Sequence, residues 1–177
     1  MTLDIYQRLG IDSGKAAQYS IVLDHLQRDR GRLRAKTTDG IEVRIFLERG
    51  KPLQVGEILQ SQCGKWVKVM GAQEPVTTAR CDDWFTFSRA CYHLGNRHVK
   101  LQIANAEGEG ERWLRITPDH VLEEMLELLG LSLKRETAVF IPESGAYSGG
   151  HSHSHAHSHS HSHHHSHAHD QNEHHHH

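Results

Sequence analysis

The chain has few cysteines, no excess of basic residues and no long run of apolar residues. Its three cysteines, Cys63, Cys81 and Cys91, are odd in number and form no C-x-x-C pair, so a disulfide framework is not expected. Lys and Arg total 20 against 22 Asp and Glu, whereas a nucleic-acid-binding protein usually carries a strong basic excess. No segment approaches the ~18 to 20 apolar residues of a membrane span, and the first residues lack the basic and apolar regions of a signal peptide. These absences predict a soluble, cytoplasmic protein that binds neither nucleic acid nor membrane.

Catalytic signatures are also missing. The sequence contains no G-x-x-x-x-G-K-[ST] loop for nucleotide phosphates. Cys91 and His93 are close in sequence, but the predicted helix puts Cys91 on its buried side and directs His93 elsewhere. They are therefore not expected to act as a nucleophile and its base. We expect the protein not to be an enzyme.

Histidine, by contrast, is abundant and concentrated in one segment. Residues 151–177 hold 15 of the 19 histidines, mostly alternating with Ser or Ala. Imidazole is a ligand for nickel, zinc and copper, and small spacers let neighbouring imidazoles surround one ion. The segment has almost no apolar surface, so we expect it to be disordered without metal. A purification tag does not explain the alternating run. The sequence does not decide whether His174–His177 are native residues or a tag. The predicted tail ligands are His151, His153, His155, His157, His159, His161, His163, His164, His165, His167 and His169.

The first part of the chain, 1–74, shows the period of two that is typical of β-strands. Apolar and polar residues alternate through 32–36 and again through 41–47, and the Asp39-Gly40 turn between them predicts a hairpin. Glycine and proline divide the rest into short runs, with nothing long enough for a convincing helix. We predict a small all-β domain here.

The second part, 75–150, alternates strands with helices. Strands are predicted at 76–80, 98–103, 112–116 and 137–141, and helices from the Asp82 cap to Gly95 and from Thr117 to Gly130. The buried stripes of these helices are predicted to include Trp84 and Val121. The order β-α-β-β-α-β is that of a ferredoxin-like domain, whose helices both pack on one face of the sheet. The predicted fold class is therefore α+β: an N-terminal all-β domain (1–74), a ferredoxin-like domain (75–150) and a disordered His-rich tail (151–177).

Four histidines lie outside the tail, and His98 is the strongest metal-ligand candidate among them. If Val99, Leu101 and Ile103 face the helices, alternation puts His98 on the open face of the sheet. A solvated surface histidine is the alternative interpretation. One imidazole cannot hold nickel or zinc tightly, so an identical chain across a two-fold axis is the simplest source of a second ligand.

The other three histidines are weaker candidates. His120 lies in the first turn of the second helix, where the helix dipole favours a neutral imidazole, and it is either a second-site ligand or a plain surface residue. His93, on the polar side of the first helix, is a possible ligand. His25, in a predicted strand of the first domain, is expected to be structural or exposed.

Three segments of the chain resemble the family of the urease accessory protein UreE, a nickel metallochaperone. They are Cys91 to Val99 (CYHLGNRHV) followed by LQI, 119–126 (DHVLEEML) and 142–147 (PESGAY). The resemblance implies a homodimer with an amino-terminal β domain and a ferredoxin-like carboxy-terminal domain. It also implies that His98 binds metal across the dimer interface and that His120 belongs to a further site in some relatives. Pro118 stands where a relative can have histidine, which leaves the tail histidines to complete such a site.

The resemblance further implies a biological role. It predicts a chaperone that captures Ni²⁺, with Zn²⁺ or Cu²⁺ as competitors, and delivers it for urease active-site assembly through the accessory GTPase UreG and the UreD-UreF-UreG assembly. A nickel or zinc storage or detoxification protein without a delivery partner is the alternative. A third interpretation is a peptide-binding β domain with an incidental tail. The sequence favours metal binding in the first two cases, and only a partner distinguishes them.

Overall fold

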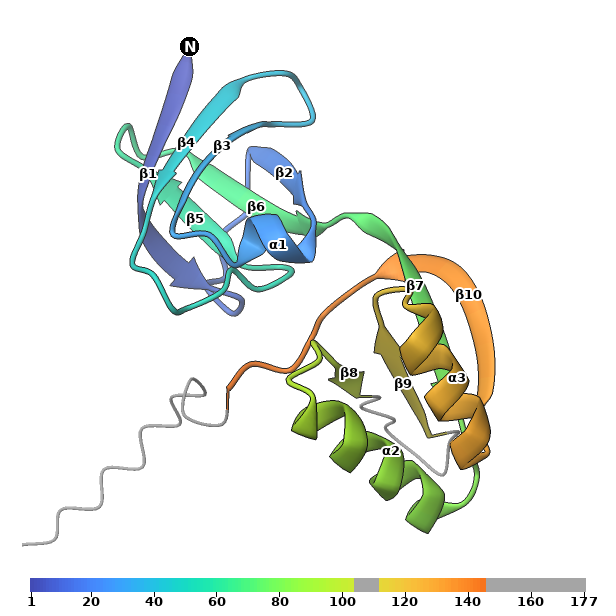
Figure 1. Ribbon diagram of the computed structural model, residues 1–177. Coiled ribbons are helices and arrows are strands. Elements are labelled where there is room, and N and C mark those ends of the chain that lie inside the picture. The colour runs from blue at the N-terminus through green and yellow to red at the C-terminus, as the bar shows by residue number, and fades with distance from the viewer. Residues whose placement is uncertain (104–111, 146–177) are drawn as a thin grey trace, which may run out of the picture.

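The computed structural model describes residues 1–103 and 112–145, which form two domains joined end to end (Figure 1). The predicted tail, 151–177, and the predicted turn at 107–111 lie outside the described residues. Among the residues described, no helix is both long enough and apolar enough to cross a membrane.

The first domain is a six-stranded sheet that folds around one apolar core. Its strands are β1 (Thr2–Gly10), β2 (Tyr19–Leu23), β3 (Arg32–Lys36), β4 (Glu42–Phe46), β5 (Ile58–Ser61) and β6 (Trp66–Gly71), in the spatial order β2-β6-β5-β1-β4-β3. Alternate residues point inward, so Leu3, Ile5, Val43 and Ile45 are buried while their neighbours face outward. The predicted hairpin is confirmed, because β3 pairs with β4 in antiparallel register from Arg32↔Phe46 to Lys36↔Glu42.

One short helix interrupts this domain, which the sequence analysis did not predict. Helix α1 spans His25–Arg28. The Asp24 side chain accepts a hydrogen bond from the Gln27 backbone N–H, and the Gln27 side-chain oxygen accepts one from the Asp24 backbone N–H. This reciprocal cap stabilises a single turn that is too short to produce a helical period in the sequence. His25 therefore begins a helix rather than lying in a strand.

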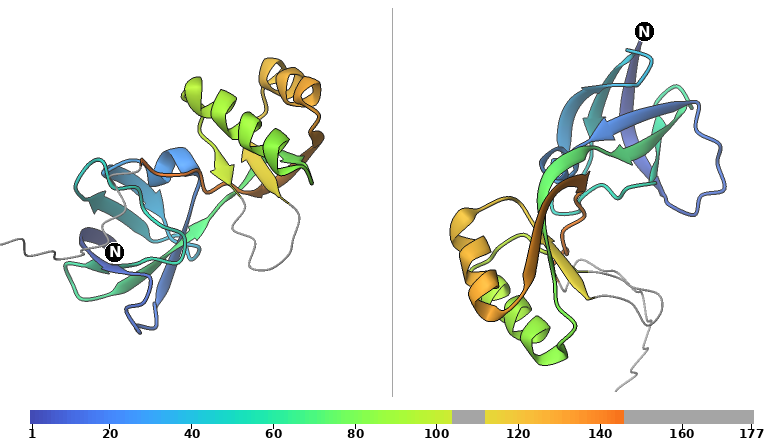
Figure 2. Two further views of the ribbon diagram at one scale, coloured as in Figure 1. Left: turned by 90° about the horizontal axis from the view of Figure 1, so that it is seen from below. Right: turned by 90° about the vertical axis from the view of Figure 1, so that its right-hand side faces the viewer.

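The second domain has the predicted ferredoxin-like topology. Its elements are β7 (Gln73–Arg80), α2 (Trp84–Asn96), β8 (Gln102–Ile103), β9 (Trp113–Ile116), α3 (His120–Leu129) and β10 (Ser132–Val139). The strands pair in the order β10-β7-β9-β8, all antiparallel, and Figure 2 shows both helices on the same side of the sheet. Phe87, Ala90 and Leu94 of α2 and Leu126 of α3 are buried in the core between the helices and the sheet.

Details of this domain differ from the predictions in ways that packing explains. Asp83, not Asp82, caps α2, and the helix continues past Gly95 to Asn96. Trp84 is exposed beside the Arg112 guanidinium, and Val121 is exposed while Leu126 takes the buried position on α3. The rest of each helix's buried side agrees with the predicted stripe, and only Trp84 and Val121 are exposed instead of buried.

The sheet face opposite the helices has a cluster of polar side chains that bind one another. Thr78 donates to Glu136 over 2.6 Å and accepts from Arg115 over 2.9 Å, and these side chains are largely buried. The chain after β10 then crosses the edge strand, where the Ile141 N–H donates to the Gln102 side chain over 3.0 Å. These side chains belong to the face itself, so the prediction that it is open to solvent or to another subunit stays untested.

Buried polar side chains hold the two domains together. The His25 ring Nδ1 lies 2.6 Å from Glu74 Oε1, and the same ring contacts Phe140 edge-on at 4.9 Å between centroids. Arg28, also buried, donates to the backbone carbonyl of Phe140. Burial lowers the pKa of the Arg28 guanidinium below its ordinary value. Because α1 belongs to the first domain while Glu74 and Phe140 belong to the second, these contacts define how the domains meet.

Candidate metal centre at the end of helix α2

His98 lies immediately after the carboxy-terminal end of α2, in a turn made by backbone hydrogen bonds. The His98 N–H donates to the carbonyl of Gly95 over 3.0 Å, and the Val99 N–H donates to the carbonyl of Leu94 over 3.2 Å. This paired arrangement is the Schellman motif, and it places His98 at the position that glycine usually occupies. Val99 packs with Leu94 in the apolar core, as the motif requires.

The backbone of His98 has a left-handed conformation with φ of 55°, and His98 is the only non-glycine residue with positive φ in the described part of the chain. A side chain with a Cβ is disfavoured there by about 1 to 2 kcal/mol. Residues held in such conformations are concentrated at functional sites. The turn thus presents an exposed imidazole on a rigid support.

This placement corrects the prediction that His98 lies on a sheet face. Strand β8 contains only Gln102 and Ile103, so the alternation that was extended back to His98 does not apply to it. Val99 and Leu101 do pack into the core, which produced the strand-like pattern. The helix was expected to end at Gly95, but it continues to Asn96 and the chain turns at Arg97 and His98.

The electrostatics of a helix end suit a bound cation. The carboxy-terminal end of α2 has a partial negative charge from its last carbonyl groups, which favours positive charge nearby. His93 lies one turn earlier, and its carbonyl accepts a hydrogen bond from Arg97 over 3.0 Å. The His98 side chain makes no hydrogen bond, ion pair or ring contact with any described residue, so its nitrogens are available to an outside ligand.

His93 faces α3 rather than open solvent, in contrast to its predicted position on the polar side. It lines a groove of about 320 Å³ between the two helices. The rim of this groove is apolar, and Val121 and Leu128 are 61 % and 83 % exposed. Tyr92, 67 % exposed, extends the apolar surface on α2. The other lining residues are Arg97, Glu124, Met125 and Leu129.

His120 lies where it was predicted, in the first turn of α3. Asp119 caps this helix by accepting hydrogen bonds from the N–H groups of Val121 and Leu122, both over 3.0 Å. His120 is exposed, as a surface ligand would be. Pro118 precedes the cap, so the residue two positions before His120 offers no metal-binding atom from its side chain.

The described part of a single chain does not contain a complete metal site. No group of three or more His, Cys, Asp or Glu side chains converges within residues 1–103 and 112–145. Burial raises the pKa of the Cys91 thiol, which disfavours a metal-binding thiolate there. His98, His93 and His120 therefore require additional ligands, from a second chain or from the tail histidines outside the described residues.

Comparisons with known proteins agree with the resemblance noted in the sequence. The profile "UreE urease accessory protein, N-terminal domain" matches residues 5–71, and "UreE urease accessory protein, C-terminal domain" matches residues 74–177. A urease accessory protein UreE of Marinomonas sp. (strain MWYL1) is 61% identical over 150 residues, covering 85% of this chain and 98% of the relative. The relative of the same name from Alteromonas mediterranea is 56% identical over 134 residues, covering 75% and 83%. That from Psychromonas ingrahamii is 47% identical over 153 residues, covering 85% and 96%.

Proposed function

The chain belongs to the UreE family of urease accessory proteins, and we propose that within this role it binds Ni²⁺ and delivers it to the urease active site. As an accessory protein it assists urease maturation and does not itself catalyse a reaction. The observation that carries the nickel proposal is His98, an unpartnered imidazole held in a left-handed turn at the negative end of α2.

A homodimer completes the His98 site in this proposal. The exposed apolar residues Val121 and Leu128 line the α2–α3 groove, and the exposed Tyr92 ring contacts His93, which also lines it. Exposed apolar surface of this kind is typical of protein–protein contacts. A two-fold contact through this surface brings two copies of His98 to one ion. A site with two imidazoles and open coordination positions favours exchange of the metal over permanent storage.

The tail histidines, His151 to His169, act as the capturing ligands. They are connected to the folded part of the chain, which keeps them at a high local concentration near the shared ion. His93 and His120 supply further donors on the surface of the second domain. Zn²⁺ and Cu²⁺ compete for the same imidazoles, because imidazole is a ligand for all three ions and Cu²⁺ binds it more tightly than Ni²⁺ does.

Delivery requires an acceptor, and membership of the urease accessory family supports an acceptor among the components of urease maturation. We infer that the acceptor is the cytoplasmic GTPase UreG within the UreD-UreF-UreG assembly, as the family resemblance implies. The competing proposal, a nickel or zinc store, predicts that the chain binds metal without accelerating urease activation.

Activation of apo-urease at limiting nickel tests the proposal. Urease, UreD, UreF and UreG are incubated with nickel that has been preloaded on this protein, or with the same nickel free in the presence of a chelator. We expect the preloaded protein to activate urease and His98→Gly to lose most of this effect. Asn96→Ala, which alters an exposed residue of the same turn without removing an imidazole, is the matched control. Equal activation by free and preloaded nickel would contradict delivery and favour storage.

A further inference from the structure

The outward face of the first domain has an uncompensated row of cations on strand β3. Arg32, Arg34 and Lys36 are exposed and occupy alternate positions, so all three point to the same side of the strand. None of their side chains forms a hydrogen bond or an ion pair with a described residue, while their backbones pair with β4. We refer to these three residues as the basic ladder.

The neighbouring strand does not neutralise this row. Opposite Arg34 lies another cation, Arg44, whose guanidinium binds the Asp4 carboxylate through two hydrogen bonds of 2.6 Å. Asp4 is therefore already paired, and Glu42, opposite Lys36, is the one acid that directly faces the ladder across the β3–β4 pair. The ladder thus keeps an excess of positive charge that other described residues leave unpaired.

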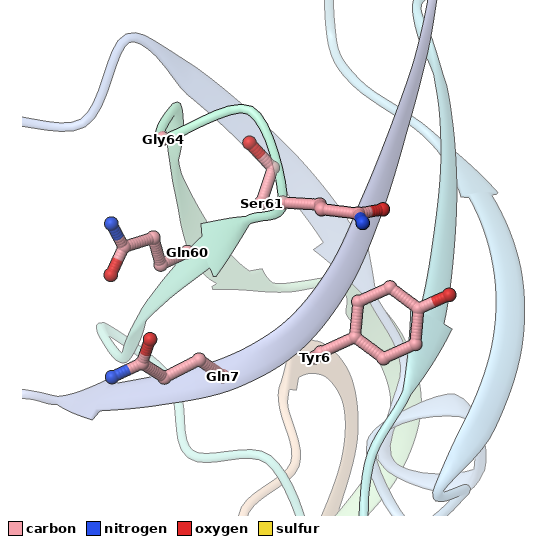
Figure 3. Close-up of a pocket in the computed structure, with 6 residues that line it drawn as sticks. Tyr6, Gln7, Gln60, Ser61 and Gly64 are labelled. Carbon is pink, nitrogen blue, oxygen red and sulfur yellow. The ribbon is translucent and has the colours of Figure 1, made fainter.

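An exposed aromatic pair lies at one end of the ladder. Phe46 is opposite Arg32, and its ring stacks on Tyr6 of β1 with centroids 5.1 Å apart. Figure 3 shows the Tyr6 ring projecting from β1 toward the neighbouring strand. Tyr6 is 56 % exposed and Phe46 39 % exposed, so the pair offers an apolar contact next to the cations.

Strand β3 is also the last strand of its sheet. It pairs with β4 on one side, and on the other side the described residues provide only the single bridge Ile21↔Thr37 beyond its end. Its remaining backbone groups are available to an added strand. An added strand repeats its side chains every two residues, about 6.6 Å, which is the spacing of the ladder itself.

We propose that this face binds an extended acidic segment of a partner protein, whose carboxylates alternate with apolar residues. Alternate carboxylates would pair with Arg32, Arg34 and Lys36, and an aromatic residue at the Arg32 end would contact Phe46, the nearer ring of the aromatic pair. The tail of this chain is not the occupant, because its only acids are Asp170 and Glu173 among fifteen histidines. This surface is separate from the nickel site, since β3 belongs to the first domain and His98 to the second.

The positive charge of the basic ladder has a simpler alternative explanation. Cations on an edge strand prevent that strand from pairing with other copies of the chain. A binding experiment on the full chain distinguishes the two. The probe is a fluorescein-labelled peptide in which Glu alternates with Val and one end has Tyr, measured by anisotropy without added metal. A peptide of the same composition with all Glu contiguous, an oligouridylate and phosphatidylserine vesicles are measured beside it.

We expect the alternating peptide to bind more tightly than the other three ligands. The triple variant Arg32→Gln/Arg34→Gln/Lys36→Gln should weaken this binding roughly tenfold, as expected for loss of three exposed ion pairs. The control variant Lys15→Gln/Lys65→Gln/Lys68→Gln removes the same charge from other exposed positions of the domain and should bind as the parent does. A charge-reversed ladder, Arg32→Glu/Arg34→Glu/Lys36→Glu, should instead bind a peptide with Lys in place of Glu.

Three results would overturn the proposal. One is equal binding of the alternating and contiguous peptides, and another is tighter binding of oligouridylate or vesicles than of either peptide. The third is an absence of peptide binding together with self-association of the Gln ladder variant, which would show that the cations only protect the edge. Circular dichroism of each variant confirms that the sheet is retained.

Discussion

His25 and His98 lie at opposite ends of two helices and show what separates a structural histidine from a ligand. His25 begins α1, is 9 % exposed and has its Nδ1 atom 2.6 Å from Glu74. His98 follows α2, is exposed and has no side-chain partner among the described residues. A metal ion needs a free imidazole nitrogen, so the histidine without partners is the one able to bind.

The two histidines also differ in their effect on stability. The contacts of His25 with Glu74 and Phe140 join the two domains, whereas the left-handed backbone of His98 is unfavourable for any residue with a Cβ. Retaining an unfavourable conformation at an exposed position is typical of a site selected for function rather than stability. Replacing His25 should therefore lower the free energy of unfolding, whereas replacing His98 with glycine should raise it.

The largest effect of these changes is expected in the number of Ni²⁺ ions bound per dimer. A chain ending at residue 150 loses the tail ligands and is expected to keep about one Ni²⁺ per dimer, held by the paired His98 side chains. Adding His98→Gly should abolish this remaining binding, whereas adding His120→Ala should leave it unchanged. Isothermal titration calorimetry with nickel measures all three proteins. Nickel that remains in the His98→Gly dimer would identify another residue, such as His93, as the bridging ligand.

The pH dependence should separate metal release from unfolding. Protons compete for imidazoles with an ordinary pKa of about 6.5, so nickel should leave the full chain as the pH falls from about 7.5 to 5.5. The fold should persist in this range, because its shifted carboxylates titrate lower. The Arg135 guanidinium lowers the pKa of Glu123, and the Thr78 hydroxyl is the main cause that lowers the pKa of Glu136.

The lowered pKa values of Glu123 and Glu136 determine how the stability of the fold changes with pH. A carboxylate with a lowered pKa stabilises the folded state above its unfolded pKa, about 4.3 for glutamate, and the contribution is lost as pH falls through the folded-state value. We expect near-ultraviolet circular dichroism to change only below about pH 4.3, after equilibrium dialysis shows nickel release. Simultaneous loss of nickel and of the dichroism signal would mean that the metal supports the fold itself.

Replacing His25 should lower the free energy of unfolding without changing nickel binding. His25→Ala leaves the largely buried Glu74 carboxylate without its ring partner and opens space against Phe140, so the free energy of unfolding should fall by about 3 kcal/mol. Urea denaturation measures this loss, and His120→Ala, an exposed histidine on α3, should change it by less than about 0.5 kcal/mol. If His25→Ala were as stable as the parent, the domain joint would not depend on this contact.

Much of the fold could be predicted because it follows from local patterns. The alternation in 32–36 and 41–47 specified the β3–β4 hairpin, and the order of strands and helices specified the ferredoxin-like domain. Helix α1 was missed because one capped turn leaves no periodic signal. The burial of Leu126 and the exposure of Val121 on α3 depend on packing against the sheet and not on the helix sequence alone.

The metal-binding role of His98 stays a prediction, whereas its predicted position on a strand is wrong. His98 was assigned to a strand because Val99 and Leu101 are apolar and alternate, yet they pack in the core as part of a helix-ending turn and the chain after it. A Schellman motif normally has glycine at this position, so histidine there hides the motif from sequence reasoning. The Glu74 partner of His25 is 49 residues away, a distance that no local pattern reveals.

The smallest predicted effect tests the cost of the His98 conformation directly. Glycine is the residue preferred at a left-handed position after a helix, so His98→Gly should raise the free energy of unfolding of the metal-free protein by about 1 kcal/mol. His98→Ala is the matched control: it also removes the imidazole but keeps a Cβ, and it should give no such gain. Urea denaturation of the two variants in the presence of a chelator measures the difference. If His98→Gly is no more stable than His98→Ala, the left-handed turn is not strained, and the contrast with His25 reduces to the presence or absence of side-chain partners.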